Sequence, residues 1–227
     1  MAAKGNTRHI RRLASSRYMK IGRKLSKYVA KPTAGRHSGM ASLALVTVLK
    51  EKVMQSTTRD IRYLLNNNAV EVNGKIIKRE KYPIGFGDII HLKPSKETYK
   101  VVSGKNGTFN IEKIKEGEKQ IFKVVGKHTV AGGKLAVRIQ DGRIFNCNDN
   151  KINVNDSVTL GKKGGIDKII PMEKGRECYV INGTHSSEKG KIAEIVKGTA
   201  SRDATVRING SNGEFETLLR NVMVIGE

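Results

Sequence analysis

Tryptophan is absent from the sequence, cysteine occurs twice, and aromatic residues make up only 5% of its 227 positions. No run of about 18 apolar residues occurs, which argues against a membrane-spanning helix. The lack of aromatic anchors also disfavours binding to a membrane surface. Cys147 and Cys178 lie far apart and form no Cys-x-x-Cys pair, so we expect two reduced thiols in a cytoplasmic protein.

Motifs for catalysis and for metal binding are missing as well. The histidines are scattered, with no His-x-x-x-His pair and no cysteine at ligand spacing, at His9, His37, His91, His128 and His185. No Gly-rich loop ends in Gly-Lys-Ser or Gly-Lys-Thr, and Gly-x-Ser-x-Gly does not occur. We therefore predict a protein that is not an enzyme, with no catalytic residue, metal, cofactor or small-molecule substrate.

Negative charge is also scarce, because 21 Asp and Glu stand against 43 Lys and Arg, which gives a formal net charge of +22. Such an excess repels itself in a compact state, so a polyanionic partner is its natural explanation. With membranes disfavoured, we predict a nucleic-acid-binding protein, with RNA as the partner. The basic start, MAAKGNTRHIRR, precedes no apolar stretch, so we expect no signal peptide.

The first forty residues are strongly basic, and no acidic residue precedes Glu51. We expect residues 1–40 to form an arm that cannot fold alone and becomes ordered along RNA, a solvated tail being the alternative. The predicted RNA contacts of the arm are Arg8, His9, Arg11, Arg12, Arg17, Lys20, Arg23, Lys24, Lys27 and Arg36. Tyr18 and Tyr28 are candidates for stacking on unpaired bases.

Helical periodicity follows the arm. Apolar residues recur every three or four positions from Leu43 to Val53 and predict a first helix. Thr57 is the expected N-cap of a second helix, with Asp60 three residues later as a variant of the capping box. Arg59 and Arg62 share the outer face of this second helix, which should end at the run of three asparagines that follows.

A β-hairpin is predicted next. The strands Val70–Val72 and Lys75–Ile77 flank Asn73-Gly74, a pair typical of a type I′ turn because both turn positions need positive φ. A further strand is expected at Ile89–Leu92. Two helices followed by a small sheet predict one α+β module over residues 41–98.

Beyond residue 98 the pattern is typical of β structure. Over residues 99–172 we expect a central antiparallel β domain with strands near Lys100–Ser103, Gln120–Val125, Leu135–Gln140, Asp156–Leu160 and Ile166–Ile170. Over residues 173–227 we expect a third unit with strands near Cys178–Ile181, Lys191–Val196, Ala204–Ile208 and Asn221–Ile225.

Four stretches follow one another in a characteristic order along the chain: RHIRRLA in the arm, Pro32-x-x-Gly35-x-His37, VEVNGKIIKREKYPIGFGDIIHL and the closing NVMVIG. In that order they resemble the archaeal and eukaryotic small-subunit ribosomal protein family S-four-e, from about Arg8 to Gly226. The resemblance implies a basic arm, a small α+β RNA-binding module of the type shared with bacterial ribosomal protein four, a central β domain and a C-terminal SH3-like KOW barrel. The end of the chain soon after this close favours an archaeal-type member.

The resemblance also implies the binding residues. A helix and the adjoining hairpin would clamp structured RNA through Arg59, Arg62, Lys75, Lys78, Arg79 and Lys81. The KOW motif would map to Tyr179–Ile195, with Gly183 in its loop and Gly190 flanked by Lys189 and Lys191. The implied partners are small-subunit rRNA and neighbouring ribosomal proteins, in the small ribosomal subunit of the cytoplasm.

Two features depart from the family pattern, since the arm lacks a tryptophan near Tyr18 and the KOW loop is long. Three other hypotheses stay open at this point. One is a free-standing RNA-binding assembly or rescue factor, because the same module occurs in such proteins. Another is an RNA-modifying enzyme of the pseudouridine synthase kind, although residues 100–227 offer little chain for its catalytic domain. The third is a DNA-binding protein.

Overall fold

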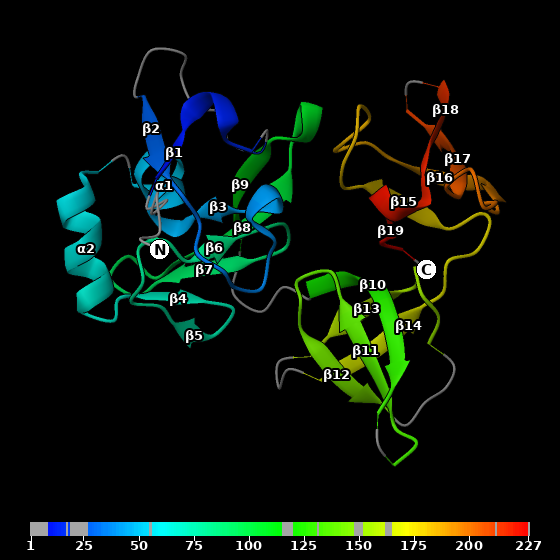
Figure 1. Cartoon of the computed structure of the whole chain (residues 1–227), viewed down its shortest axis with the longest axis horizontal. Helices are drawn as coiled ribbons and strands as arrows, with labels where there is room; N and C mark the ends of the chain where they lie inside the picture. The colour runs from blue at the N-terminus through cyan, green and yellow to red at the C-terminus, as the bar shows by residue number, and fades with distance from the viewer. Residues whose placement is uncertain are drawn as a thin grey trace, which may run out of the picture. The chain divides into compact units, whose positions relative to one another are not determined.

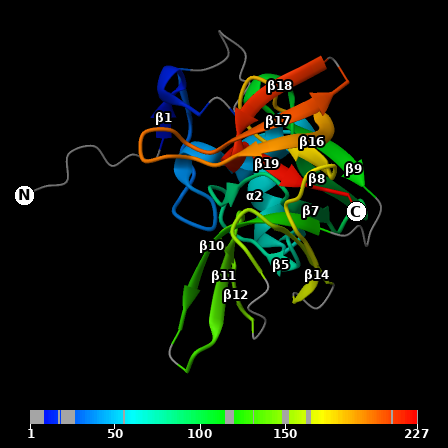
Figure 2. The ribbon, with the colours of Figure 1, turned by 90° about the vertical axis from the view of Figure 1, so that its right-hand side faces the viewer.

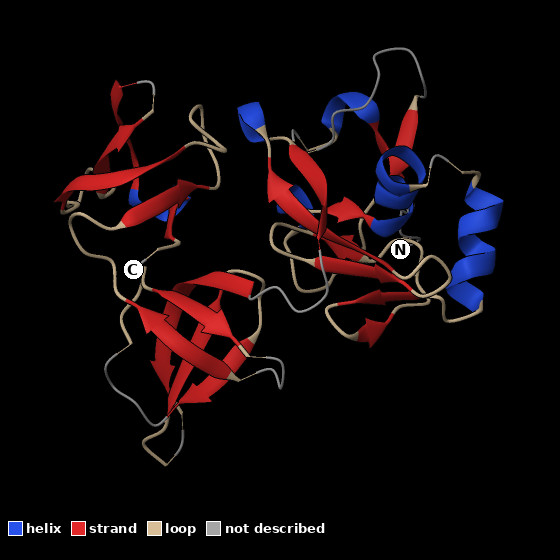
Figure 3. Ribbon diagram, turned by 180° about the vertical axis from the view of Figure 1, so that it is seen from behind, coloured by secondary structure: helices blue, strands red, loops and turns tan. Residues whose placement is uncertain are grey.

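The computed structural model describes residues 9–16, 18, 27–54, 56–114, 120–130, 132–147, 152–161, 165–211 and 213–226. The fold is mostly β with few helices, as Figures 1 and 3 show. It divides into two compact units, Met1–Val102 with Thr108–Glu116, and Ser103–Gly107 with Gly117–Glu227. No helix among the described residues is both long and apolar enough to cross a membrane.

The first unit begins with a short hairpin of the arm, in which β1 (His9–Arg11) pairs antiparallel with β2 (Tyr28–Ala30). The predicted first helix is shorter than expected. Leu43–Ala44 instead form β3, which pairs with β6 (Pro83–Ile84), and α1 spans only Leu45–Val48. A π-helical turn, η3 (Leu49–Val53), continues it. The spacing of apolar residues could not distinguish the strand β3 from the helix α1, because residues 42–49 are all buried and no exposed face marks the period.

The second helix, α2 (Thr58–Asn66), confirms the prediction made from its cap. Thr57 N donates to Asp60 Oδ2 at 3.1 Å and Asp60 N donates to Thr57 Oγ1 at 3.4 Å, so the capping box is complete. Hydrogen bonds from Thr57 lower the pKa of the Asp60 carboxyl, which keeps the cap ionised. Ile61 and Leu65 are buried, which leaves Arg59 and Arg62 exposed on the outer side.

The predicted hairpin is confirmed as β4 (Val70–Val72) and β5 (Lys75–Ile76). Asn73 and Gly74 have φ of 50° and 75°, as a type I′ turn requires. The predicted strand β7 (Ile89–Leu92) joins β8 (Glu97–Ser103) and β9 (Phe109–Ile114) in a sheet of order β5-β4-β7-β8-β9. Sequence reasoning missed β9, which lies at one end of this sheet.

The second unit contains two five-stranded antiparallel sheets. The first has the order β12-β11-β10-β13-β14, from β10 (Gln120–Thr129), β11 (Leu135–Ile139), β12 (Ile144–Cys147), β13 (Ser157–Leu160) and β14 (Ile166–Ile170). β10 and β11 run side by side as a long ribbon (Figure 2). Phe122, Val124 and Val137 belong to its core. The edge strand β12 was not predicted.

The second sheet of this unit has the order β18-β17-β16-β15-β19, from β15 (Glu177–Val180), β16 (Lys189–Val196), β17 (Thr205–Gly210), β18 (Gly213–Leu218) and β19 (Val222–Val224). Cys178, Ile192 and Val206 are buried in its core. Four of its strands match predicted runs, whereas the edge strand β18 was missed, because its inward-facing residues are only partly buried and its apolar alternation is weak.

Candidate nucleic-acid interface

A buried carboxylate holds the end of the arm against the sheet of the first unit. The Asp88 side chain is 2% exposed and lies 2.9 Å from His37 Nε2. It also accepts hydrogen bonds from Gly85 N at 2.9 Å and from Asn73 Nδ2 at 2.7 Å. A Cβ on Gly85 would lie 2.4 Å from His37 Nδ1, so only glycine fits there. The Asp88 carboxylate therefore holds together the end of the arm, the hairpin turn and the segment that leads into β7.

On the outer side of α2, Arg59 and Arg62 are both exposed, as predicted. Arg62 forms a fork with Glu80, with Nε donating to Oε2 at 2.7 Å and Nη2 to Oε1 at 3.4 Å. These hydrogen bonds raise the pKa of Arg62 above its ordinary value. The guanidinium is thus held in a fixed plane while 62% of its side chain stays exposed.

The segment after the hairpin brings the predicted cations near this helix. Lys75, Lys78 and Arg79 are exposed, and Lys81 is half-buried. Glu80, between two of them, reaches Arg62 of α2, so the helix and this segment meet. The arm joins them, because Thr33 N donates to the Lys81 carbonyl at 2.9 Å. Three separate parts of the chain therefore converge here.

A cavity of about 340 Å³ lies at this convergence. Its lining comes from β2, α1, η3, α2 and the segment at Glu80, namely Tyr28, Val29, Ala30, Val46, Thr47, Lys50, Glu51, Thr58, Arg62, Glu80 and Lys81. Sequence reasoning did not find Lys50 or Thr47 as lining residues, because only the fold places the π-helical turn beside the arm. Of the predicted contacts, Arg62 and Lys81 reach the cavity.

The structure describes part of the predicted arm. Arg11 and Lys27 are exposed, and Arg12 and Arg36 are half-buried. Arg8, Arg17, Lys20, Arg23, Lys24 and the side chain of His9 lie outside the described residues. Tyr18, expected to stack on a base, is stacked on Phe109 with ring centroids 4.4 Å apart. Tyr28 is 45% exposed, with Lys27 Nζ 5.6 Å from its ring centroid.

In the C-terminal sheet, the predicted contacts Lys189 and Lys191 both lie on β16 and are exposed, so the strand begins two residues earlier than expected. Gly190 lies between them, and a Cβ there would come within 2.6 Å of Asn209 O. The close approach that this glycine permits is therefore to β17 of the same sheet. Gly183 has a φ of 103°, a conformation that favours glycine.

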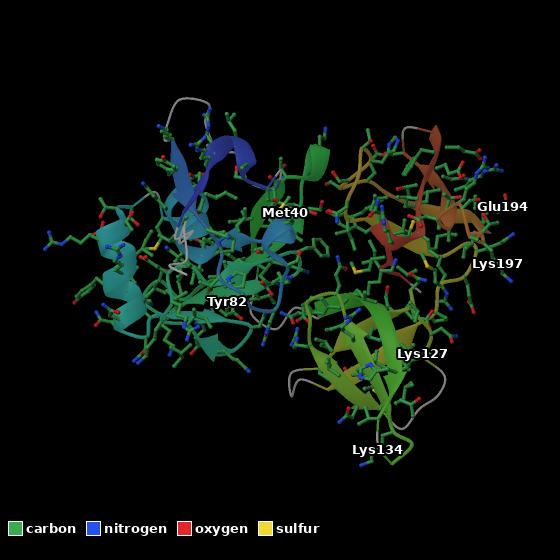
Figure 4. The ribbon with its side chains drawn as sticks, in the orientation of Figure 1. Met40, Tyr82, Lys127, Lys134, Glu194 and Lys197 are labelled. Carbon is green, nitrogen blue, oxygen red and sulfur yellow. The ribbon has the colours of Figure 1, made fainter. Side chains whose placement is uncertain are left out.

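The charges are distributed unevenly along the chain. Residues 1–98 hold 21 Lys and Arg against six Asp and Glu, a formal charge of +15. Residues 173–227 hold eight of each sign and are neutral. There Arg207 pairs with Glu194 at 3.2 Å and Arg220 with Asp203 at 3.4 Å. Figure 4 shows Glu194 and Lys197, of opposite charge, on β16 and just beyond it.

The region between, residues 99–172, has a charge of +7, from 14 basic and seven acidic residues. Lys134 lies at the tip of the β10–β11 ribbon and Lys127 on β10 (Figure 4), and both are exposed. Neither was among the predicted contacts. Excess positive charge is therefore present in residues 99–172 as well as in residues 1–98, whereas residues 173–227 contribute none.

Candidate groups for other chemistry are few. Within the described ranges, no group of three or more His, Cys, Asp and Glu side chains is arranged to hold a metal ion. Cys178 is fully buried, and desolvation raises the pKa of its thiol to about 11. A neutral, buried thiol is a poor nucleophile, so Cys178 serves as a small apolar core residue.

Comparisons with known proteins show which proteins this chain is similar to. Residues 95–164 match the model of the ribosomal family S4e, and residues 45–90 match the model of the S4 domain. Two archaeal relatives are each named small ribosomal subunit protein eS4. The one from Methanocella arvoryzae is 35% identical over 96% of this chain and 94% of its own length. The one from Nanoarchaeum equitans is 32% identical over 97% of this chain and 96% of its own length.

The similarity extends to a eukaryote and to a solved structure. The eS4 protein of Dictyostelium discoideum is 26% identical over 99% of this chain and 86% of its own length. The crystal structure of the 30S ribosomal protein S4e from Thermoplasma acidophilum superposes with a TM-score of 0.71 at 25% identity, covering 82% of this chain and 96% of that one.

Proposed function

This chain belongs to the S4e family of ribosomal proteins, and we propose that it is a structural constituent of the small ribosomal subunit that binds rRNA. Its partners would be that rRNA and the neighbouring ribosomal proteins, in the cytoplasm. The observation that carries the proposal is the convergence of arm, α2 and hairpin segment, all rich in Lys and Arg, within the part of the chain that holds a charge of +15. This role requires no covalent change in any substrate.

Binding would be dominated by phosphate contacts. Each phosphate that Lys or Arg neutralises releases condensed counterions, so affinity falls with salt with a log–log slope of roughly −0.7 to −0.9 per contact. Such contacts give register and orientation. Selectivity for one rRNA site would come from RNA shape and from unpaired bases, because the deep groove of A-form RNA hides base edges.

The finer layout is part of this proposal. The arm would be residues 1–40, the helix–hairpin module 41–98, the central β domain 99–172 and the KOW-type barrel 173–227. The S4-domain match at residues 45–90 supports the second of these. The two separate five-stranded sheets of the second unit support the division between the third and the fourth, whereas β8 and β9, within residues 97–114, pair in the sheet of the first unit. Arg59 of α2 and Lys75 of the hairpin are the exposed phosphate contacts that best report on the module.

The test is sedimentation of a native cell extract through sucrose gradients at low and at high salt, with this chain quantified in each fraction. We expect the chain in mature small subunits at near one copy each, released only at high salt. A chain that sediments free, or only with a minor precursor fraction, would instead be an assembly or rescue factor.

A further inference from the structure

We propose that the cavity between the arm and α2 receives one unpaired nucleotide of the RNA, with its base stacked on Tyr28 and on the guanidinium plane of Arg62. This rests on the proposed function, because the ligand is part of the same RNA. The volume of about 340 Å³ is near the lower end of ligand sites, roughly 300–1,000 Å³, which suits one nucleotide and not a duplex.

The lining has the chemistry of a nucleotide site. Val29 and Val46 are buried and give the cavity an apolar floor. Lys50 is exposed at its rim. Thr47, which is 9% exposed, supplies a hydroxyl that can either donate or accept a hydrogen bond. Apolar surface beside polar groups matches the flat faces and hydrogen-bonding edge of a base. Lys50, Arg62 and Lys81 stand against Glu51 and Glu80 in the lining, which leaves one net positive charge to meet a phosphate.

The fork between Arg62 and Glu80 is the feature that points to stacking. An arginine that only neutralised phosphate would gain nothing from a glutamate that cancels its charge. The two hydrogen bonds to Glu80 instead fix the guanidinium plane, while 62% of the side chain stays open to a ligand. Bases stack on Arg planes and on aromatic rings in RNA complexes. Tyr28, 45% exposed on β2, is the ring that lines the same cavity.

The π-helical turn η3 gives independent support. Turns of this kind are rare and frequently lie at functional sites. Here η3 carries Lys50 and Glu51 to the cavity. Val46 N also donates to the Glu80 carbonyl at 2.8 Å, which ties α1 to the segment that orients Arg62. The cavity therefore has a preformed wall.

The experiment compares binding of full-length variants to a small-subunit rRNA transcript across a range of salt concentrations. Arg62→Lys keeps the positive charge but loses the planar fork, and Tyr28→Ala removes the ring. We expect each to weaken binding about 5- to 100-fold with the salt slope unchanged, as loss of one stacked base does. Tyr28→Phe, which keeps the ring, should bind as the parent protein does.

Chemical probing of the RNA provides the second readout. One unpaired base should be protected by the parent protein and by Tyr28→Phe, and become reactive with Tyr28→Ala and Arg62→Lys. Unchanged affinity and an unchanged footprint for both of these variants would overturn the cavity proposal while leaving rRNA binding intact. A parent protein that fails to bind the transcript would instead refute the proposed function itself. Thermal unfolding of each variant identifies any loss that comes from misfolding.

Discussion

The ammonium group of Lys123 donates a hydrogen bond to the main-chain oxygen of Val222, 2.9 Å away and 99 positions later in the sequence. It also donates to the Leu219 carbonyl at 2.5 Å. Lys123 lies on β10 and is only 3% exposed, so a buried cation joins the two sheets of the second unit. Ser157 on β13 adds a bond at the same junction, accepting from Val224 N at 3.0 Å.

The Lys123 junction predicts a pH dependence of stability. Burial lowers the pKa of Lys123 from 10.5 to about 8. Between these values the unfolded chain holds a proton that the folded chain has released, so the contribution of Lys123 to the free energy of unfolding rises with pH. Below about pH 8 both states are charged and the contribution is constant.

Urea denaturation of the parent protein and of Lys123→Met, from pH 7 to 10, measures this effect. The difference in unfolding free energy, parent minus variant, should increase above pH 8 in favour of the parent protein. The raised pKa of Cys178 makes its own contribution to the free energy of unfolding fall with pH. Because Cys178 is present in both proteins, this contribution cancels in the difference. A difference that stays flat with pH would show that Lys123 is not buried in solution.

Asp88 is expected to be the most sensitive polar residue of the first unit. Asp88→Ala removes the acceptor of three hydrogen bonds and leaves buried donors unsatisfied. Each unsatisfied donor lowers the free energy of unfolding by about 1–3 kcal/mol. We expect a loss of about 3 kcal/mol or more, measured by chemical denaturation. Asp88→Asn, which keeps the shape and one acceptor, should lose less. Equal stability of the alanine variant and the parent would contradict the arrangement.

The helix–hairpin face should dominate the salt dependence of RNA binding. Arg59→Glu with Lys75→Glu removes about two phosphate contacts, so the log–log salt slope should become shallower by roughly 1.4–1.8. Affinity should fall at every salt concentration, and filter binding to the rRNA transcript over a salt series measures both quantities. Circular dichroism serves as the control for folding, because both side chains are exposed.

The neutral C-terminal sheet should contribute less to phosphate binding. Lys189→Glu with Lys191→Glu makes the same charge change as the preceding pair, in a region whose formal charge is zero. We expect a clearly smaller change in the salt slope than for Arg59 and Lys75. A change as large as theirs would assign the C-terminal sheet a full share of the rRNA contacts.

The buried thiol of Cys178 should be protected from reagents in the folded protein. Cys178 is fully buried and its pKa is about 11, whereas Cys147 is partly exposed. At pH 8, Ellman's reagent should modify Cys147 first and Cys178 only as the chain unfolds. Peptide mapping of the product identifies the modified thiol, and rapid labelling of Cys178 in native conditions would count against its placement in the core.

Local chemistry made part of this fold predictable. Thr57 and Asp60 form a capping box because they are three residues apart at a helix start, and Asn73-Gly74 forms a type I′ turn because these residues tolerate positive φ. The excess of positive charge favoured RNA, and the order of the motifs along the chain indicated the family. The division into four domains stays a prediction.

Tertiary structure decided what depends on residues far apart in sequence. The edge strands β9, β12 and β18 carry weak local patterns, so pairing with a neighbouring strand defines them. Arg62 and Glu80, which form the fork, are 18 positions apart in the sequence. His37 and Asp88 are 51 positions apart, and Lys123 and Val222 are 99 positions apart. Sequence determines which side chains are available, whereas chain folding determines which of them meet, because a contact at such a separation must offset the entropy cost of closing the intervening loop, and no local pattern records it.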